Sequence, residues 1–250
     1  MLAILSLVLG VAFVFSMVGL GGAQVYTPTF YWMGMDVRTQ AVPLALWLNF
    51  ATQITAGVNY WRHGLVKFRV ALPMIAGLIV FAPIGAMVSH RVPDSVILFL
   101  FATMTFAAAV QSLSGWKPRG GEYRRAKLAV IGLVVGGGTG FLGGMIGRGG
   151  GSLLVPILLL MGFDPKHAAA TSAFAVGFSA LAGFLGHLGA TGLGVTWGWF
   201  AAFTAAAMLA AFGGSRTMAG HLDAGRVRRL FSILLLGIAT KLYWDVFHGN

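Results

Sequence analysis

The sequence predicts an all-α membrane protein made of two repeats of opposite orientation. Three observations lead to this prediction: the composition, a glycine-rich stretch between apolar runs, and a second copy of that stretch. The chain is 58% hydrophobic and only 9% charged, whereas soluble domains carry about 25% charged residues. Several apolar runs approach the ~20 residues that a bilayer span requires. We therefore expect a polytopic protein with little mass outside the membrane.

The glycine-rich stretch reads Gly-Arg-Gly-Gly-Gly over residues 147–151 and separates the apolar runs Leu128–Ile146 and Leu153–Met161. Each glycine costs about 1 kcal/mol relative to alanine inside a helix. The helix is therefore expected to open at Gly147–Gly151 and to restart near Ser152. The first N–H groups of a restarting helix are unpaired and favour an anion. In hydrocarbon, such an opening must be buried in protein or line a cavity.

This stretch occurs twice in the chain. Residues 19–28 repeat the layout of residues 147–156 at an offset of 128 positions. We predict two homologous halves, 1–122 and 123–250, because internal duplication is common in transporter folds. The identities at this offset run from Gly10 to Gly85 and include Gly19, Gly21, Gly22, Pro28, Gly34, Asp36, Phe50 and Gly64.

Each half contains five apolar segments, and the second of each is too short to span alone. We expect the first two to form a glycine-broken re-entrant or half-helix pair, followed by three spanning helices. The first segment lacks a basic leader and a cleavage signal, which predicts a retained helix rather than a signal peptide. The segments are Leu2–Val18, Val25–Met33, Val42–Tyr60, Val70–Val88 and Val96–Leu113, then Leu128–Ile146, Leu153–Met161, Ala168–Gly186, Val195–Phe212 and Val227–Val246.

The positions of the basic residues predict the orientation, because cytoplasmic loops collect Lys and Arg. In the first half the basic loops follow the third segment and the fifth; in the second half the basic loop follows the fourth. This change predicts inverted repeats with both termini outside. The net charge of +11 is thereby assigned to topology, and no nucleic-acid partner is expected. The loop residues are Arg62, Lys67, Arg69, Lys117, Arg119, Arg124, Arg125, Lys127, Arg216, Arg226, Arg228 and Arg229.

Acidic and metal-binding residues are scarce. Asp36, Asp94, Asp164 and Asp223 precede predicted helices and are interpreted as caps. No carboxylate is left for a membrane core, so a carboxylate relay is not expected. The chain has no cysteine, and its six histidines stand apart, which predicts neither a metal nor a cofactor. No nucleophile motif is visible, and we do not expect an enzyme.

Arg148 is the sharpest candidate for contact with an anion, because a guanidinium is always charged and presents a planar fork to oxyanions. Two alternatives stay open: Arg148 could reach the cytoplasmic surface, or bind carbonyls of the opened helix. Its counterpart Leu20 is uncharged, so the site is predicted to be asymmetric. The glycines Gly21, Gly22, Gly149, Gly150 and Gly151 are expected to form the binding backbone, with close helix packing as the alternative.

Polar residues beside the two openings complete the predicted site. Gln24 and Ser152 occupy equivalent first-turn positions, where each could donate to an anion or simply cap the helix. Thr171 and Ser172 lie in the first turns of the third segment of the second half. Asn49, Gln53 and Asn59 mark the same segment of the first half. Polar groups in a span face the bundle or a wet cavity, and hydrogen bonds between helices are the alternative use.

These residues resemble the sulfite exporter TauE/SafE family of bacterial membrane permeases over nearly the whole chain, in two copies. In the second copy the resemblance rests on Gly147, Gly149–Gly151, Pro156, Gly162, Ala170-Thr171-Ser172, Gly192, Trp197, Gly213 and Arg226–Arg229. The first copy departs at Ala23 and at Pro43-Leu44, although Gly64–Phe68 and Gly85 fit. Arg148 also departs, because the family carries a small or apolar residue there.

The resemblance implies movement of small sulfur-containing anions, such as sulfite or organosulfonates, across the cytoplasmic membrane. We therefore expect a secondary transporter that works by alternating access, with the bilayer and such an anion as partners. Either H⁺ or Na⁺ could be the coupling ion, and a homo-oligomer is compatible with the sequence. The alternatives are an anion channel and a non-transporting membrane subunit that assists assembly.

Overall fold

The computed structural model describes residues 2–36, 40–88, 125–146, 151–191 and 197–248, together with isolated positions between 99 and 114. Every regular element in these ranges is helical, which confirms the all-α class. The predicted segment Val96–Leu113 lies largely outside the described residues. The elements are α1 (Leu2–Val18), α2 (Ala23–Trp32), α3 (Val42–Arg62), α4 (Phe68–Val88), α6 (Arg125–Ile146), α7 (Gly151–Leu160), α8 (Pro165–Thr191), α9 (Trp197–Arg216), a π-helical turn (Thr217–His221) and α10 (Ala224–His248).

The helix ends follow the capping chemistry of the sequence. α8 begins at Pro165, and the carbonyl of the preceding Asp164 accepts a hydrogen bond from the Ala168 N–H at 2.8 Å. α10 follows Asp223, whose Oδ1 accepts from the Arg226 N–H at 2.8 Å. Proline at the first helical position and aspartate before it both favour a helix start. The predicted capping role of Asp223 is confirmed.

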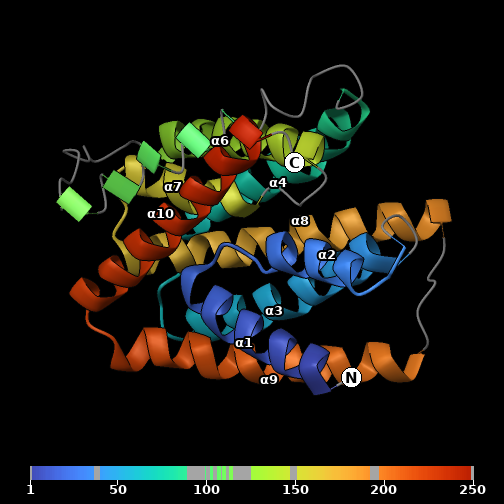
Figure 1. Cartoon of the computed structure of the whole chain (residues 1–250). Helices are drawn as coiled ribbons and strands as arrows, with labels where there is room; N and C mark the ends of the chain where they lie inside the picture. The colour runs from blue at the N-terminus through green and yellow to red at the C-terminus, as the bar shows by residue number, and fades with distance from the viewer. Residues whose placement is uncertain are drawn as a thin grey trace.

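Two long helices, α3 and α8, cross in the middle of the molecule (Figure 1). They run antiparallel: Gly57 lies against Phe174, Gly177 against Ile54, and Gly183 against Leu46. Positions rise on α3 as they fall on α8. The residues in these contacts lie around the middle of each helix, so the two helices meet there. One of them comes from each half of the chain.

The outer helices pair across the two halves. α4 packs on α6, and α1 packs on α9 (Figure 1). The other contacts also occur in equivalent pairs, in which each helix is replaced by its equivalent from the other half. The contact of α4 with α8 corresponds to that of α9 with α3, and the contact of α7 with α8 corresponds to that of α2 with α3. Both halves therefore contribute to each side of the molecule, on either side of the α3–α8 crossing.

Close contact between α4 and α6 depends on small residues. Gly132, Gly136 and Gly140 recur at every fourth residue of α6, and a Cβ at each would meet the α4 backbone or Pro73. Without a hydrophobic driving force in lipid, helices associate through such close packing. The same holds on the opposite side, where Gly214 of α9 lies on the Phe13 carbonyl of α1.

The outer faces of these helices carry large apolar side chains. A continuous exposed apolar surface marks contact with lipid or a partner. One described stretch, Pro165–Leu185 of α8, is long and apolar enough to cross a bilayer by length and composition, and the apolar helices Ile4–Val18, Phe68–Ile84 and Ala129–Leu142 are shorter. The exposed residues include Leu72, Ile79, Val80 and Phe81 on α4, Val130, Leu133 and Val134 on α6, Leu209 and Phe212 on α9, and Ile233 on α10.

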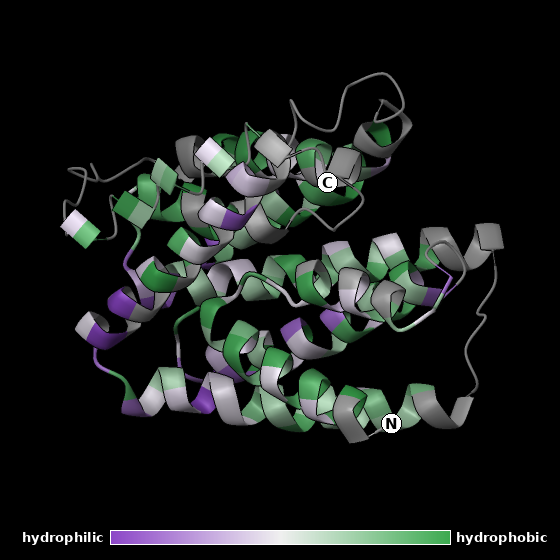
Figure 2. Cartoon of the chain, in the orientation of Figure 1, coloured by the Kyte–Doolittle hydropathy of each residue, from purple (hydrophilic) through white to green (hydrophobic). Residues whose placement is uncertain are grey.

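Basic loops from both halves meet at one end of the molecule. Lys166 Nζ donates to the Ala219 carbonyl at 3.3 Å, and His167 Nδ1 lies 2.8 Å from the Leu65 carbonyl oxygen. Hydrophilic residues gather around the junction of α9 and α10 at this end (Figure 2). The loops at 62–69 and 216–229 thus lie on the same side, and these are loops that the charge pattern assigns to the cytoplasm.

Candidate functional site

The chain opens between α1 and α2, where the sequence predicts the first glycine break. α1 ends at Val18 and α2 begins at Ala23. Gly19 and Gly21 have φ angles of +71° and +82°, which residues with a side chain rarely adopt. Residues 19–22 are all buried. The opening is therefore confirmed, and it lies inside the protein, where unpaired backbone groups are tolerated.

The first break is attached to α8 of the other half. The Ser172 hydroxyl donates to the Gly19 carbonyl at 2.9 Å, and both residues are buried. Gly19 also lies on the backbone of Ala169, where a Cβ would collide with the carbonyl group. This contact joins the opened part of the first half to the first turns of α8.

The start of α2 directs its first N–H groups into this opening. The Gly22 carbonyl accepts from the N–H groups of Val25 and Tyr26, both at 2.9 Å. Ala23 and Gln24 precede these bonds, so their N–H groups belong to the unpaired first turn of a helix. The Tyr26 hydroxyl donates to the Val8 carbonyl at 3.3 Å and ties α2 to α1. The Gln24 side chain lies outside the described residues.

The second break is described only at its borders. α6 ends at Ile146, as predicted, and α7 starts at Gly151, one residue before the predicted restart at Ser152. Residues 147–150 lie outside the described residues, and so does the side chain of Ser152. Three residues of the predicted site, Arg148, Gly149 and Gly150, therefore lie outside the described residues.

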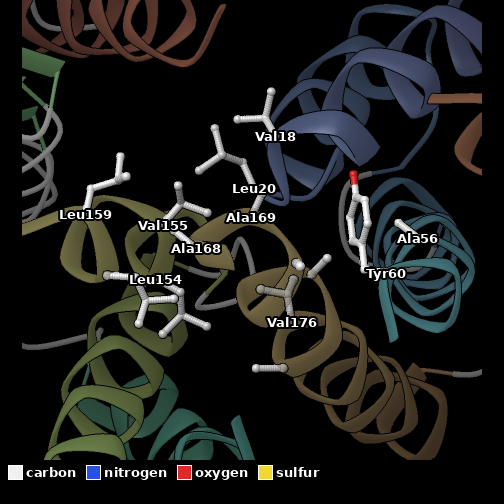
Figure 3. Packing of buried hydrophobic residues seen from close by; sticks show 14 of the residues in the cluster. Val18, Leu20, Ala56, Tyr60, Leu154, Val155, Leu159, Ala168, Ala169 and Val176 are labelled. Atoms are coloured by element: carbon white, nitrogen blue, oxygen red, sulfur yellow. The ribbon is translucent and has the colours of Figure 1, made fainter. Parts of the chain in front are cut away.

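The borders of the two breaks share one buried cluster. Leu20 from the first break is grouped with Leu154 and Val155 from the first turns of α7. In Figure 3, Leu20 and Val155 are seen above Ala168 and Ala169 of α8. Leu20 and the start of α7 are thus parts of the same core, together with the first turns of α8.

Thr171 and Ser172 are fully buried and paired with the first half. Thr171 Oγ1 accepts from the Lys67 N–H at 3.1 Å, while Ser172 donates to Gly19. Both hydrogen bonds cross from α8 to backbone groups of the other half. The structure therefore gives these two predicted site residues the alternative use, hydrogen bonding between elements.

Another set of polar side chains, on α3, carries buried atoms that make no hydrogen bond. Asn49, Thr52 and Gln53 are 2%, 0% and 0% exposed. Asn49 Oδ1, Thr52 Oγ1 and both amide atoms of Gln53 are buried without a hydrogen bond in the described structure. Buried polar atoms are nearly always paired, and each unpaired one costs about 1–3 kcal/mol. We call these three residues the α3 polar face.

The α3 polar face is directed at the first break. A Cβ built on Gly21 would lie 2.9 Å from Asn49 Nδ2 and even closer to Oδ1. The Tyr26 hydroxyl of α2 lies within reach of the Thr52 hydroxyl, although the pair does not have the geometry of a hydrogen bond. Gln53 follows Asn49 by four residues and so shares its side of the helix. Three neutral polar groups thus lie beside the opening between α1 and α2.

Sequence reasoning found part of this face. It singled out Asn49 and Gln53 as polar residues in a span, but it omitted Thr52 and placed none of the three in the site. Asn59, singled out on the same grounds, donates to Ser215 Oγ of α9 at 2.9 Å, which confirms hydrogen bonding between helices. The available signal was spacing, because positions 49, 52 and 53 lie on one face of a helix.

Comparisons with known proteins agree on the class of protein. Residues 3–242 match the family described as "Sulfite exporter TauE/SafE". The chain is 28% identical to "Probable membrane transporter protein YunE" of Bacillus subtilis, over 75% of this chain and 77% of that protein. It is 25% identical to "Probable membrane transporter protein y4hK" of Sinorhizobium fredii, over 94% of each. No solved structure gives a significant match.

Proposed function

Because the chain belongs to the sulfite exporter TauE/SafE family of membrane transporters, we propose that it is a secondary transporter of small sulfur-containing oxyanions, of sulfite or organosulfonate type. Transport would proceed by alternating access across the cytoplasmic membrane. The names of the curated relatives specify membrane transport and no substrate. The substrate class therefore rests on the family description and on the chemistry of the opening.

The observation that carries this proposal is the buried opening at residues 19–22, from which α2 starts. A helix start supplies free N–H groups and a positive dipole end, and both favour an anion. The buried polar side chains in the described part of the chain are all neutral. With no buried carboxylate among them, this environment favours an anion over a cation.

The second opening would complete the site from the other half. In this proposal Gly149, Gly150, Gly151 and Ser152 supply the start of α7, as Gly21, Gly22 and Gln24 supply the start of α2. Arg148 neutralises part of the charge of the anion. Support comes from the shared cluster of Leu20 with Leu154 and Val155, which brings the borders of the two openings into one core.

The exchanged packing of the halves supports alternating access. An inverted repeat of residues 1–122 and 123–250 explains why the contacts occur in equivalent pairs. The packing of α4 on α6, for example, corresponds to the packing of α9 on α1. The two outer pairs form bodies on either side of the α3–α8 crossing, and rocking of these bodies would expose the site to each side in turn. The basic end then faces the cytoplasm, and both termini lie outside.

Uptake of radiolabelled sulfite into proteoliposomes tests this function. We expect protein-dependent uptake that responds to an imposed pH or sodium gradient and saturates with sulfite. Liposomes without protein are the first control, and Arg69→Ala, at the exposed start of α4, is the second. Absence of uptake for sulfite and for 2-aminoethanesulfonate contradicts the proposal. Rapid uptake that neither saturates nor responds to a gradient indicates a channel instead.

A further inference from the structure

We propose that the α3 polar face is the surface that binds the oxyanion, so that neutral hydrogen-bond donors from one helix recognise the substrate. This inference rests on the proposed function and assigns its specificity to Asn49, Thr52 and Gln53. These residues belong to no motif and are not repeated in the second half. What distinguishes them is four buried polar atoms that make no hydrogen bond.

The unpaired atoms match the needs of an oxyanion. Thr52 can donate one hydrogen and Gln53 two, and an amide can present its NH₂ group by rotating about its terminal bond. Asn49 can do the same next to Gly21. Unpaired buried polar atoms on one helix face are unfavourable in an empty protein, and the donors among them, the Thr52 hydroxyl and the Gln53 NH₂ group, are satisfied by a ligand with acceptor oxygens.

The electrostatic potential at this position favours an anion over a cation. The face lies beside the start of α2, whose dipole is positive, and the N–H groups of Ala23 and Gln24 are at that start. The same three side chains also offer neutral oxygens, which could bind Na⁺. A cation would sit at the positive end of the helix with no buried carboxylate among the described residues to offset its charge.

The repeat places this face in one half only. At the offset of 128 positions, Asn49, Thr52 and Gln53 correspond to Gly177, Ala180 and Leu181 of α8. Gly177 lies against the α3 backbone at Ile54, so α8 contributes close packing where α3 contributes polar groups. Within the residues that the structure describes, this face therefore has no equivalent on α8, and it is located where the two central helices pack together. Both sides of the membrane can reach this position in turn when the outer helices move.

Replacing the polar atoms with apolar groups of similar shape tests the inference. The double variant Thr52→Val/Gln53→Leu removes three of the four unpaired atoms. We expect the purified variant without anion to melt a few degrees higher than the wild type, because the buried unpaired atoms are gone. Sulfite should no longer raise its melting temperature, and sulfite binding should weaken by about tenfold for each lost hydrogen bond.

Asn59→Leu is the matched control, because Asn59 is a buried amide of the same helix that is paired with Ser215. It should melt lower than the wild type and retain the stabilisation by sulfite. Chloride, with no array of oxygens, should not replace sulfite in the wild type.

Four results overturn the inference. In the first, the double variant melts lower than the wild type and still binds sulfite, which makes the face structural. In the second, Na⁺ and not sulfite loses its stabilising effect in the variant, which makes the face a cation site. In the third, the wild type binds neither sulfite nor 2-aminoethanesulfonate, and the proposed function fails as well. Normal sulfite transport with an unaffected double variant overturns this inference alone.

Discussion

The central helices α3 and α8 occupy corresponding places in the two halves, yet they use their polar residues differently. On α8 the polar pair Thr171 and Ser172 lies in the first turns, and both hydroxyls bond to backbone of the other half. On α3 the corresponding positions are Pro43 and Leu44. Three buried polar residues near the middle of α3, Asn49, Thr52 and Gln53, instead carry atoms without a hydrogen bond.

This difference separates polar groups that hold the fold from those that are available to a ligand. A buried hydroxyl with a fixed backbone partner stabilises the native arrangement. A buried amide without a partner destabilises the empty protein and gains most when a ligand arrives. By this criterion α8 holds the two halves of the chain together, and α3 recognises the oxyanion. Two helices at equivalent positions of the predicted repeat thus use their polar residues in different ways.

The largest effect is expected for Gly21→Ala. The left-handed backbone costs about 1–2 kcal/mol for a residue with a Cβ, and the new methyl group would also collide with the Asn49 amide. We expect low folded yield and no sulfite uptake. Gly34→Ala is the matched control, because Gly34 has a φ of +86° and no atom within 4 Å of the added Cβ. Equal losses in the two variants would show that the contact with Asn49 has no role.

A second substitution tests whether the collision with Asn49 causes the loss of folded yield in Gly21→Ala. Asn49→Ala should partly restore the folded yield of Gly21→Ala, because it removes the colliding amide. Thermal melting of the two single variants and the double variant measures the coupling between these positions. Additive effects would contradict the packing of the break against α3.

Arg148→Ala should lower sulfite uptake about tenfold or more, since a hydrogen bond to a charged group contributes about 1.5–3 kcal/mol. The folded yield should be unchanged. Arg69→Ala, at the exposed start of α4, should transport normally. Unchanged uptake in Arg148→Ala removes this residue from the site and leaves recognition to the neutral groups on α3.

Ser172→Ala tests the fastening role of α8. It leaves the buried Gly19 carbonyl unpaired, so we expect a loss of about 1–3 kcal/mol in the free energy of unfolding. Thr55→Ala is the comparison, because the Thr55 hydroxyl bonds only to the Ala51 carbonyl within its own helix. Thermal melting in detergent measures both. If Ser172→Ala melts like the wild type while losing sulfite binding, its hydroxyl belongs to the site and the contrast with α3 fails.

The smallest effect is expected for Asp223→Ala at the start of α10. The side chain accepts from the Arg226 N–H, and loss of such a cap costs about 1 kcal/mol. Melting should shift slightly, and uptake should not change. A strong loss of uptake would link the basic end of the molecule to transport.

The sequence predicted the helices better than their contacts. The end of α1 at Val18 and the start of α8 at Pro165 follow from local chemistry, namely glycine breaks and an Asp-Pro cap. The pairing of Thr171 with Lys67 and of Ser172 with Gly19 joins residues more than a hundred positions apart. No local pattern specifies such contacts.

The α3 polar face shows the same limit. Its residue types are visible in the sequence, but whether a buried amide is paired depends on the element that faces it. Asn59 and Gln53 are both buried amides of α3, and only Asn59 meets a hydroxyl, on α9. The unpaired state, which carries the proposal, therefore required the tertiary structure.

Counterflow of sulfite tests the central claim most directly. Proteoliposomes preloaded with unlabelled sulfite are placed in a trace of radiolabelled sulfite, and the label inside is followed over time. A transporter with one alternating oxyanion site should accumulate label transiently and faster than empty vesicles, and the variant Thr52→Val/Gln53→Leu should not. Uptake that is independent of internal sulfite, or identical in the wild type and this variant, would contradict the account.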